Sequence, residues 1–66
     1  MNVKLTIKKH NGAWAVFRTL DAWGPVMIAH NRTAPDAQDY AWQCAKAYSD
    51  HGDDVMVTID ARGEYT

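Results

Sequence analysis

The first third of the chain alternates between apolar and polar residues in a way that predicts a β-hairpin. Residues 3–8 switch strictly between aliphatic and polar side chains, which is typical of a strand with one buried face. Asn11-Gly12 follows, and this dipeptide is the strongest short-range hairpin signal because both residues tolerate positive φ. Residues 13–20 are then expected to form the returning strand.

A two-residue turn fixes the register of this hairpin. It pairs His10 with Ala13, and directly opposed residues share a face. One face then collects Val3, Leu5, Ile7, Trp14, Val16 and Leu20, with Arg18 as the exception. The other face collects Lys4, Thr6, Lys8, His10, Ala13, Ala15, Phe17 and Thr19. The two strands sort independently into the same apolar and polar faces, which supports the predicted register.

The remaining pattern predicts a strand, a helix and a strand. Residues 21–25 contain Gly-Pro and are expected to form a loop, followed by a short strand over 26–30. A helix is predicted over 34–50, with Thr33 as N-cap, Pro35 in the first turn and Gly52 as C-cap. Its buried stripe is expected to hold Ala37, Ala41, Cys44 and Tyr48, flanked by Tyr40 and Ala47. Residues 55–59 form the last predicted strand, and 61–66 a turn and tail.

These elements predict a single α+β domain over residues 1–66, in the order β-β-β-α-β. The helix returns the chain so that the last strand runs parallel to the first, and the simplest sheet order is 3-2-1-4. The helix is expected to cover the face that carries Val3, Leu5, Ile7, Val16, Val57 and Ile59. The sequence predicts no second helix, so the other face of the sheet is expected to stay open.

Composition adds limits on the setting. Cys44 is the only cysteine, which excludes an internal disulfide within these 66 residues and fits a reducing compartment. The chain has no apolar stretch near the roughly 20 residues of a membrane span, and its N-terminus lacks a signal-peptide core. We therefore expect a cytoplasmic protein without a membrane partner.

Charge is divided unevenly along the chain, although the net charge is only −1. Residues 1–33 hold five basic residues and one acidic residue, whereas residues 34–66 hold two basic and seven acidic residues. Such asymmetry is either a hint about partners or a chance feature of a small domain.

Candidate chemical groups do not form a catalytic or metal-binding pattern. His10, His30, His51 and Cys44 have no metal-ligand spacing, and Cys44 is expected to be a small buried hydrophobe. The Asp50, Asp53 and Asp54 cluster is predicted to be a solvated turn. The sequence thus predicts no enzyme, no cofactor, no metal and no small-molecule substrate.

The open sheet face is the first candidate binding surface. It is predicted to carry Lys4 and Lys8 around an apolar centre of Phe17, Met27 and Met56. Because Phe17 is expected to be exposed there, Phe17→Asp is predicted to leave the fold intact. Exposed apolar patches usually mark interaction sites, whereas basic and aromatic sheet faces also bind nucleic acids. A small, half-solvated face without a partner is the third interpretation.

Two tryptophans are further candidates. Trp42 points about 140° from the centre of the helix's buried stripe, at the 100° per residue of an α-helix. It is either a binding residue or is buried under the Trp23 loop or Tyr65. Trp23 either anchors its own loop or faces a partner.

Short motifs resemble two related groups of small domains. The run Gly12-Ala13-Trp14-Ala15-Val16, the Thr33 helix start and the alanines at 37, 41 and 45 are similar to an uncharacterised bacterial and phage family. The strand order also resembles the HicB-like antitoxin fold, a partial ribonuclease-H-like domain. The chain lacks the C-terminal DNA-binding helices and the Pro-Gly-Cys-like motif of those antitoxins, so the resemblance implies the fold and transfers no functional residue.

The sequence therefore predicts a non-enzymatic small binding protein. It is expected to dock a partner protein or a second copy, as a dimer, through the open sheet face or the Trp42 surface. Such domains are common in phages and mobile elements, which makes that origin an expectation. The alternative is a nucleic-acid-binding module that uses the basic and aromatic sheet face.

Overall fold

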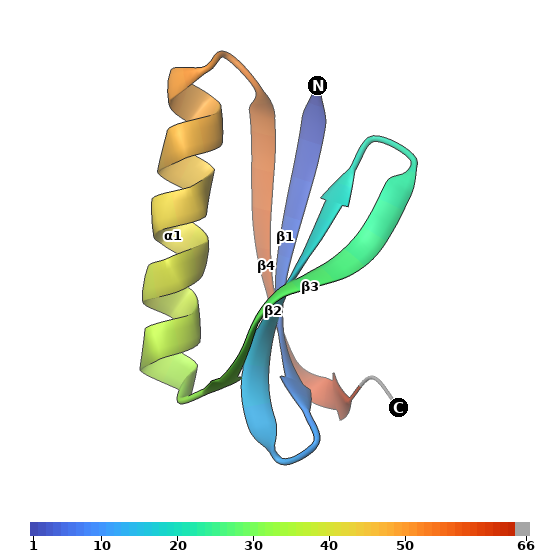
Figure 1. Ribbon diagram of the computed structural model, residues 1–66, viewed down its shortest axis with the longest axis vertical. Helices are drawn as coiled ribbons and strands as arrows, with labels where there is room; N and C mark the ends of the chain where they lie inside the picture. Colours follow the sequence, from blue (N-terminus) through green and yellow to red (C-terminus); the bar gives the residue numbers. More distant parts are fainter. Residues whose placement is uncertain (65–66) are drawn as a thin grey trace.

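The predicted chain order is the order found in the computed structural model, which describes residues 1–64 and, among these, every side chain except Asn31 and residues 61–64. The elements are β1 (Asn2–His10), β2 (Ala13–Leu20), β3 (Trp23–Arg32), α1 (Ala34–Asp50) and β4 (Asp54–Glu64). The strands form one sheet in the order β3-β2-β1-β4, and α1 lies along one face of it (Figure 1). The predicted α+β class and sheet order are confirmed.

The β1–β2 hairpin has the register that its turn predicts. Ile7 lies opposite Val16, and His10 opposite Ala13. The turn residues Asn11 and Gly12 have φ of 52° and 80°, the left-handed conformation that this dipeptide accepts. Local turn chemistry thus fixes which residues of both strands face the helix.

The pairing of β1 with β4 is parallel, as the helical crossover requires. Leu5 lies opposite Val57 and Ile7 opposite Ile59, and the register is one-to-one from Asn2 and Asp54 onward. Lys8 still pairs with Asp60 in this register. The register then shifts, and Lys9 pairs with Glu64. Residues 54–60 therefore form an uninterrupted parallel partner for β1.

Two strands extend beyond their predicted bounds. The connection after β2 is only Asp21 and Ala22, because Asp21 adopts φ 49° and closes a tight turn. Its N–H donates to Asn2 O at 2.8 Å, which ties this turn to the start of β1. β4 continues as strand to Glu64, where a turn was predicted from Ala61, because the edge of β1 still offers a partner at Lys9. The rest of the predicted tail, residues 65–66, lies outside the described residues.

The helix begins and ends where capping residues predict. Thr33 Oγ1 accepts a hydrogen bond from the Asp36 N–H at 3.4 Å, and Pro35 occupies the first turn. At the other end the C-cap is His51, one residue before the predicted Gly52, and Gly52 follows it with φ 89°. The glycine reverses the chain into β4.

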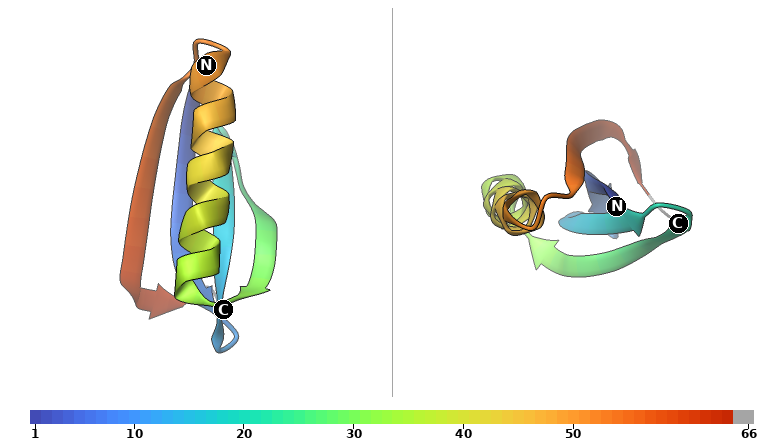
Figure 2. Two further views of the ribbon diagram at one scale, coloured as in Figure 1. Left: turned by 90° about the vertical axis from the view of Figure 1, so that its left-hand side faces the viewer. Right: turned by 90° about the horizontal axis from the view of Figure 1, so that it is seen from above.

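The sheet is strongly twisted, so its second face is not flat. The start of β3 and the end of β4 both project away from the helix side (Figures 1 and 2). Seen from above, the two edge strands bend around β1 and β2 (Figure 2, right). Strand twist accumulates across a sheet in this way, and it partly encloses the middle of the face that was expected to be open.

The core lies between α1 and the two middle strands. Its largest fully buried side chains are Leu5, Ile7 and Val16, and the helix contributes three alanines. These are Ala37, Ala41 and Ala45. Cys44, Tyr40 and Tyr48 pack against this core as half-buried residues, as does Trp14, which was placed on the apolar face of the hairpin.

Two predictions about the covered face are wrong. The buried stripe runs through Ala45, whereas Ala47, which was expected to flank it, is exposed. Ile59 was expected to lie under the helix but is 52% exposed. Both differences concern how the helix is set on the sheet, since it packs through its three alanines and covers Val55 and Val57 of β4 but does not reach Ile59.

Arg18 is the polar exception on the core face, as the register predicts. Its Nη1 donates a hydrogen bond to the Tyr48 hydroxyl at 3.0 Å, across from β2 to the end of α1. Its Nε is buried and has no hydrogen-bond partner among the described residues. The phenol of Tyr48 is therefore an important partner for a half-buried cation.

Replacing Tyr48 with Phe is expected to lower the free energy of unfolding by about 1–2 kcal/mol, because a hydrogen bond to a charged group is lost. Urea denaturation measures it. In an Arg18→Met background the same replacement should cost roughly 0.5 kcal/mol or less, since the charge no longer needs the hydroxyl. Tyr40→Phe is the matched control on the same helix. Equal costs of Tyr48→Phe in both backgrounds would contradict the assignment.

Gly24→Ala is expected to destabilise the fold by about 2–3 kcal/mol. At φ +109° an alanine is strained, and its Cβ would lie 2.7 Å from Arg18 O. Gly12→Ala is the control, because Gly12 also has positive φ but a Cβ there meets no described atom within 4 Å; it should cost about 1 kcal/mol. Denaturation midpoints compare the two, and equal losses would show that the close approach of β2 and β3 has no effect.

Candidate functional site

The structure separates the predicted binding residues into three places. Lys4 and Met56 are exposed neighbours on the second sheet face, where they are directly opposed. Trp42 is 60% exposed on the helix, and Trp23 is 81% exposed at the start of β3. Of the two interpretations left open for each tryptophan, exposure is the one found.

The prediction that Phe17 is exposed on this face is wrong, because its side chain is only 7% exposed. It lies opposite Thr6 and Met27, and its ring meets His10 edge-on at 6.0 Å between centroids. The bending of the edge strands around β2 gives the middle of this face more cover than a flat sheet would have. Phe17 is therefore a packing residue, and Met27 beside it is half-buried.

Lys8 is held within the protein rather than presented to a ligand. Its Nζ lies 3.6 Å from Asp60 Oδ2, and its side chain is only 15% exposed. The pairing of Lys8 with Asp60 across the β1–β4 ladder brings the two groups together. This half of the predicted basic face is thus partly neutralised by the acidic half of the chain.

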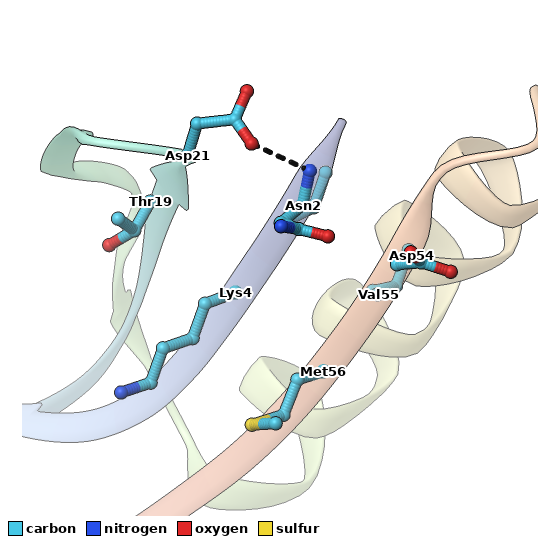
Figure 3. Close-up of a pocket in the computed structure, with 8 residues that line it drawn as sticks. Asn2, Lys4, Thr19, Asp21, Asp54, Val55 and Met56 are labelled. Atoms are coloured by element: carbon cyan, nitrogen blue, oxygen red, sulfur yellow. Dashed lines mark hydrogen bonds between the residues drawn. The ribbon is translucent and has the colours of Figure 1, made fainter.

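A hollow of about 310 Å³ remains on this face near the start of β1 (Figure 3). It is lined by Asn2, Val3, Lys4, Thr19, Asp21, Asp54, Val55 and Met56. Asp21 Oδ1 accepts a hydrogen bond from the Asn2 N–H at 2.9 Å, so that carboxylate serves the turn. Lys4 lies between Thr19 and Met56, and the hollow presents one ammonium beside two carboxylates, which does not favour a polyanion.

The second surface is a groove between α1 and β4. It measures about 340 Å³ and is lined by Trp42, Ala45, Lys46, Ser49, Val55 and Val57. Ile59 follows on the same face of β4 and is exposed, because side chains alternate along a strand. We name these seven residues the Trp42–β4 surface. It combines a large exposed indole with a row of aliphatic side chains.

The outer edge of β4 adds unpaired main-chain groups to this surface. The Asp54 N–H donates to Met1 O at 3.0 Å, so it points toward the β1 side. Successive residues of a strand direct these groups to opposite sides. The N–H and C=O groups of Val55, Val57 and Ile59 therefore point outward, where the sheet has no further strand among residues 1–64.

The opposite edge of the sheet is built differently. β3 carries Gly24 with φ +109° and Pro25, which has no N–H, and its pairing with β2 is interrupted by several register shifts. Proline and bulges are the devices that prevent an edge strand from pairing with another chain. From Val55 to Ile59, β4 contains no proline, glycine or charged residue. Residues 55–59 of β4 thus lack the protection against pairing that β3 has.

Titratable residues do not converge elsewhere. Within the part of the chain that the structure describes, no group of three or more His, Cys, Asp or Glu residues has a metal-binding arrangement. His30 and His51 are exposed, and Cys44 is half-buried against the core. Among the described residues, α1 is neither long enough nor apolar enough to cross a membrane.

Comparisons of the chain with models of known protein families, with curated proteins and with solved structures gave no match. The resemblance to the small phage and bacterial family and to the HicB-like antitoxins therefore stays a prediction. The function proposed below therefore rests on the geometry of the chain itself.

Sequence reasoning missed part of the Trp42–β4 surface. It singled out Trp42 and assigned Val57 and Ile59 to the covered face; Val57 does pack against the core, whereas Ile59 is exposed. The available signal was the predicted sheet order, which already placed the last strand at an edge. Combined with the absence of Pro, Gly and Lys from residues 55–59, that order points to an open pairing edge.

Phe17→Ala is expected to lower the free energy of unfolding by about 3 kcal/mol or more, because it empties a buried aromatic site. Phe17→Asp should cost more still, since it also buries a carboxylate. Lys4→Ala on the same face is the control, and its effect should stay within about 0.5 kcal/mol. Thermal or urea unfolding followed by circular dichroism measures all three. A stable, fully folded Phe17→Asp protein would contradict the burial of this ring.

Proposed function

We propose that this chain is a non-enzymatic binding protein that docks another protein, or a second copy of itself, through the Trp42–β4 surface. The observation that carries the proposal is the exposed indole of Trp42 beside an unprotected edge strand. Tryptophan is enriched among the residues that dominate binding energy, and open edges pair with further strands. A partner that occupied this surface would cover both features at once.

The open sheet face is the weaker candidate for the same role. Its predicted apolar centre is buried at Phe17, and Lys8 is engaged by Asp60. Lys4 and Met56 remain exposed there, but the hollow they line also holds Asp21 and Asp54. These observations favour neither a protein nor a nucleic acid at the centre of this face, so the nucleic-acid alternative stays a prediction, as do the phage origin and antitoxin-like role.

Local charge on the Trp42–β4 surface suits a protein partner. Lys46 is its single charged side chain, and Asp60 at the end of the paired segment is engaged by Lys8. Asp53, in the turn before β4, lies 3.6 Å from the amino group of Met1. The surface is therefore apolar with little net charge, as the centres of protein interfaces are.

Trp42→Lys is expected to weaken association about thirty-fold, because an interface tryptophan commonly contributes about 2 kcal/mol or more. The measurement is affinity capture from the native cells with mass-spectrometric identification, together with light scattering for self-association. Gln43→Lys adds the same charge at the next exposed helix position, which lines a different depression with Arg32 and Asp36, and should change neither readout.

Circular dichroism must show that both variants retain the fold, which is expected because both positions are exposed. If Trp42→Lys captures the same proteins and has the same mass as the unmodified chain, the Trp42–β4 surface is not the binding surface and the proposal fails.

A further inference from the structure

The free edge of β4 has the features of a strand that pairs with itself. We propose that two copies of this chain join antiparallel along β4, about a two-fold axis at Met56, to form one continuous eight-stranded sheet. This inference rests on the proposed function, since it names the occupant of the Trp42–β4 surface. It follows from the direction of main-chain groups, from the residues that each register would oppose, and from the exposed apolar side chains.

The direction of the main-chain groups limits the possible registers. Val55, Val57 and Ile59 direct their N–H and C=O groups outward, because Asp54 donates inward to Met1 O. In an antiparallel pair, hydrogen-bonded positions must oppose outward-facing residues on both strands. Two-fold axes at positions 56, 57 and 58 all satisfy this condition within the uninterrupted segment 54–60.

Charge and polarity separate these three registers. An axis at Val57 opposes Asp54 with Asp60 of the second copy, twice, and directly opposed like charges destabilise a strand pair. An axis at Thr58 opposes the apolar Met56 with Asp60. An axis at Met56 opposes Val55 with Val57 and Asp54 with Thr58, whose hydroxyl can donate to a carboxylate. Within residues 54–58 the Met56 register is the one without a mismatch, and Ile59 would lie opposite Asp53 beyond the end of this segment.

The exposed side chains match the same arrangement. Met56 is 62% exposed, and on the two-fold axis it would contact its own copy as a closely spaced, non-hydrogen-bonded pair. Because the axis is perpendicular to the sheet, both helices lie on one side, and each Trp42 overhangs the groove beside the new strand pair. The exposed side chains of Met56 and Trp42 thus lie at the same edge of the sheet as the outward main-chain groups of β4.

A second copy suits this edge better than a foreign basic or acidic strand. Asp60 is engaged by Lys8, and the segment's other charged residue, the exposed Asp54, would lie opposite the Thr58 hydroxyl of the second copy. The valines at 55 and 57 are complementary to themselves in the chosen register, which is what an isologous interface requires. The small core, with three alanines as its buried helix residues, also leaves the fold a thin margin that association would increase.

The test places single cysteines on β4 in a Cys44→Ala background. Met56→Cys should form a covalent dimer on mild oxidation, because Cα atoms of a non-hydrogen-bonded pair lie about 4.5 Å apart, within the range of a disulfide. Thr58→Cys is the matched control on the same face of the same strand. Its copy would lie opposite position 54, roughly 13 Å away at 3.3 Å per residue, so it should stay monomeric on a non-reducing gel.

A second measurement uses the unmodified chain. Light scattering should give the mass of two chains at high concentration. Hydrogen exchange should show that the amides of Val55 and Val57 become protected as concentration rises, whereas those of Met56 and Thr58, which face β1, are protected throughout. A monomer at all concentrations, unprotected outward amides, or a Thr58→Cys dimer as abundant as that of Met56→Cys would each overturn the inference.

These outcomes are distinct from failure of the proposed function. If the chain is monomeric but captures another protein in a Trp42-dependent manner, the β4 pairing is wrong and the binding surface stands. If light scattering and crosslinking show the β4 dimer but Trp42→Lys changes neither mass nor capture, the edge pairs without Trp42, and the proposed function must be restricted to β4.

Discussion

The close packing of three helix alanines onto the middle of the sheet is the contact on which the rest of the structure depends. Ala37, Ala41 and Ala45 let the helix backbone approach Leu5, Ile7 and Val16, which are fully buried. A helix is only about 10 Å wide, whereas the outer strands of a four-stranded sheet are roughly 14 Å apart. A single helix centred on the middle strands covers Val55 and Val57 of β4 but not Ile59, which is exposed, and Trp42 faces a groove instead of the core.

The features that local chemistry determines could be predicted from the sequence. The Asn11-Gly12 turn sets the hairpin register, and that register alone sorts two strands into faces. Thr33 and Pro35 set the start of the helix, and the helical crossover sets the parallel direction of β4. Even Arg18, a polar residue on an apolar face, was placed correctly, because parity along a strand leaves it no other side.

The features that depend on the whole sheet could not be predicted in this way. The burial of Phe17 follows from accumulated twist, which bends the edge strands around β2 and has no signature in residues 13–20. The lateral position of the helix decides whether Ala45 or Ala47 is buried, and the two interpretations differ by a small rotation about the helix axis. For the same reason Trp42 could be recognised as unusual, but its neighbours on β4 could not be named without the structure.

The two edges of the sheet differ in a way that links the fold to its proposed role. The ladder of β3 is irregular, and Gly24 has a conformation that residues with side chains rarely adopt. These irregularities hinder the pairing of another strand with the β3 edge. β4 keeps a regular ladder from Asp54 to Asp60, and its residues 55–59 contain none of the proline, glycine or charged side chains that would protect an edge exposed to water. An exposed indole beside that strand would be a second, independent liability if the surface stayed empty. A single occupant removes both liabilities, which is why the edge and Trp42 are best understood as parts of one binding surface rather than as two imperfections of a small domain.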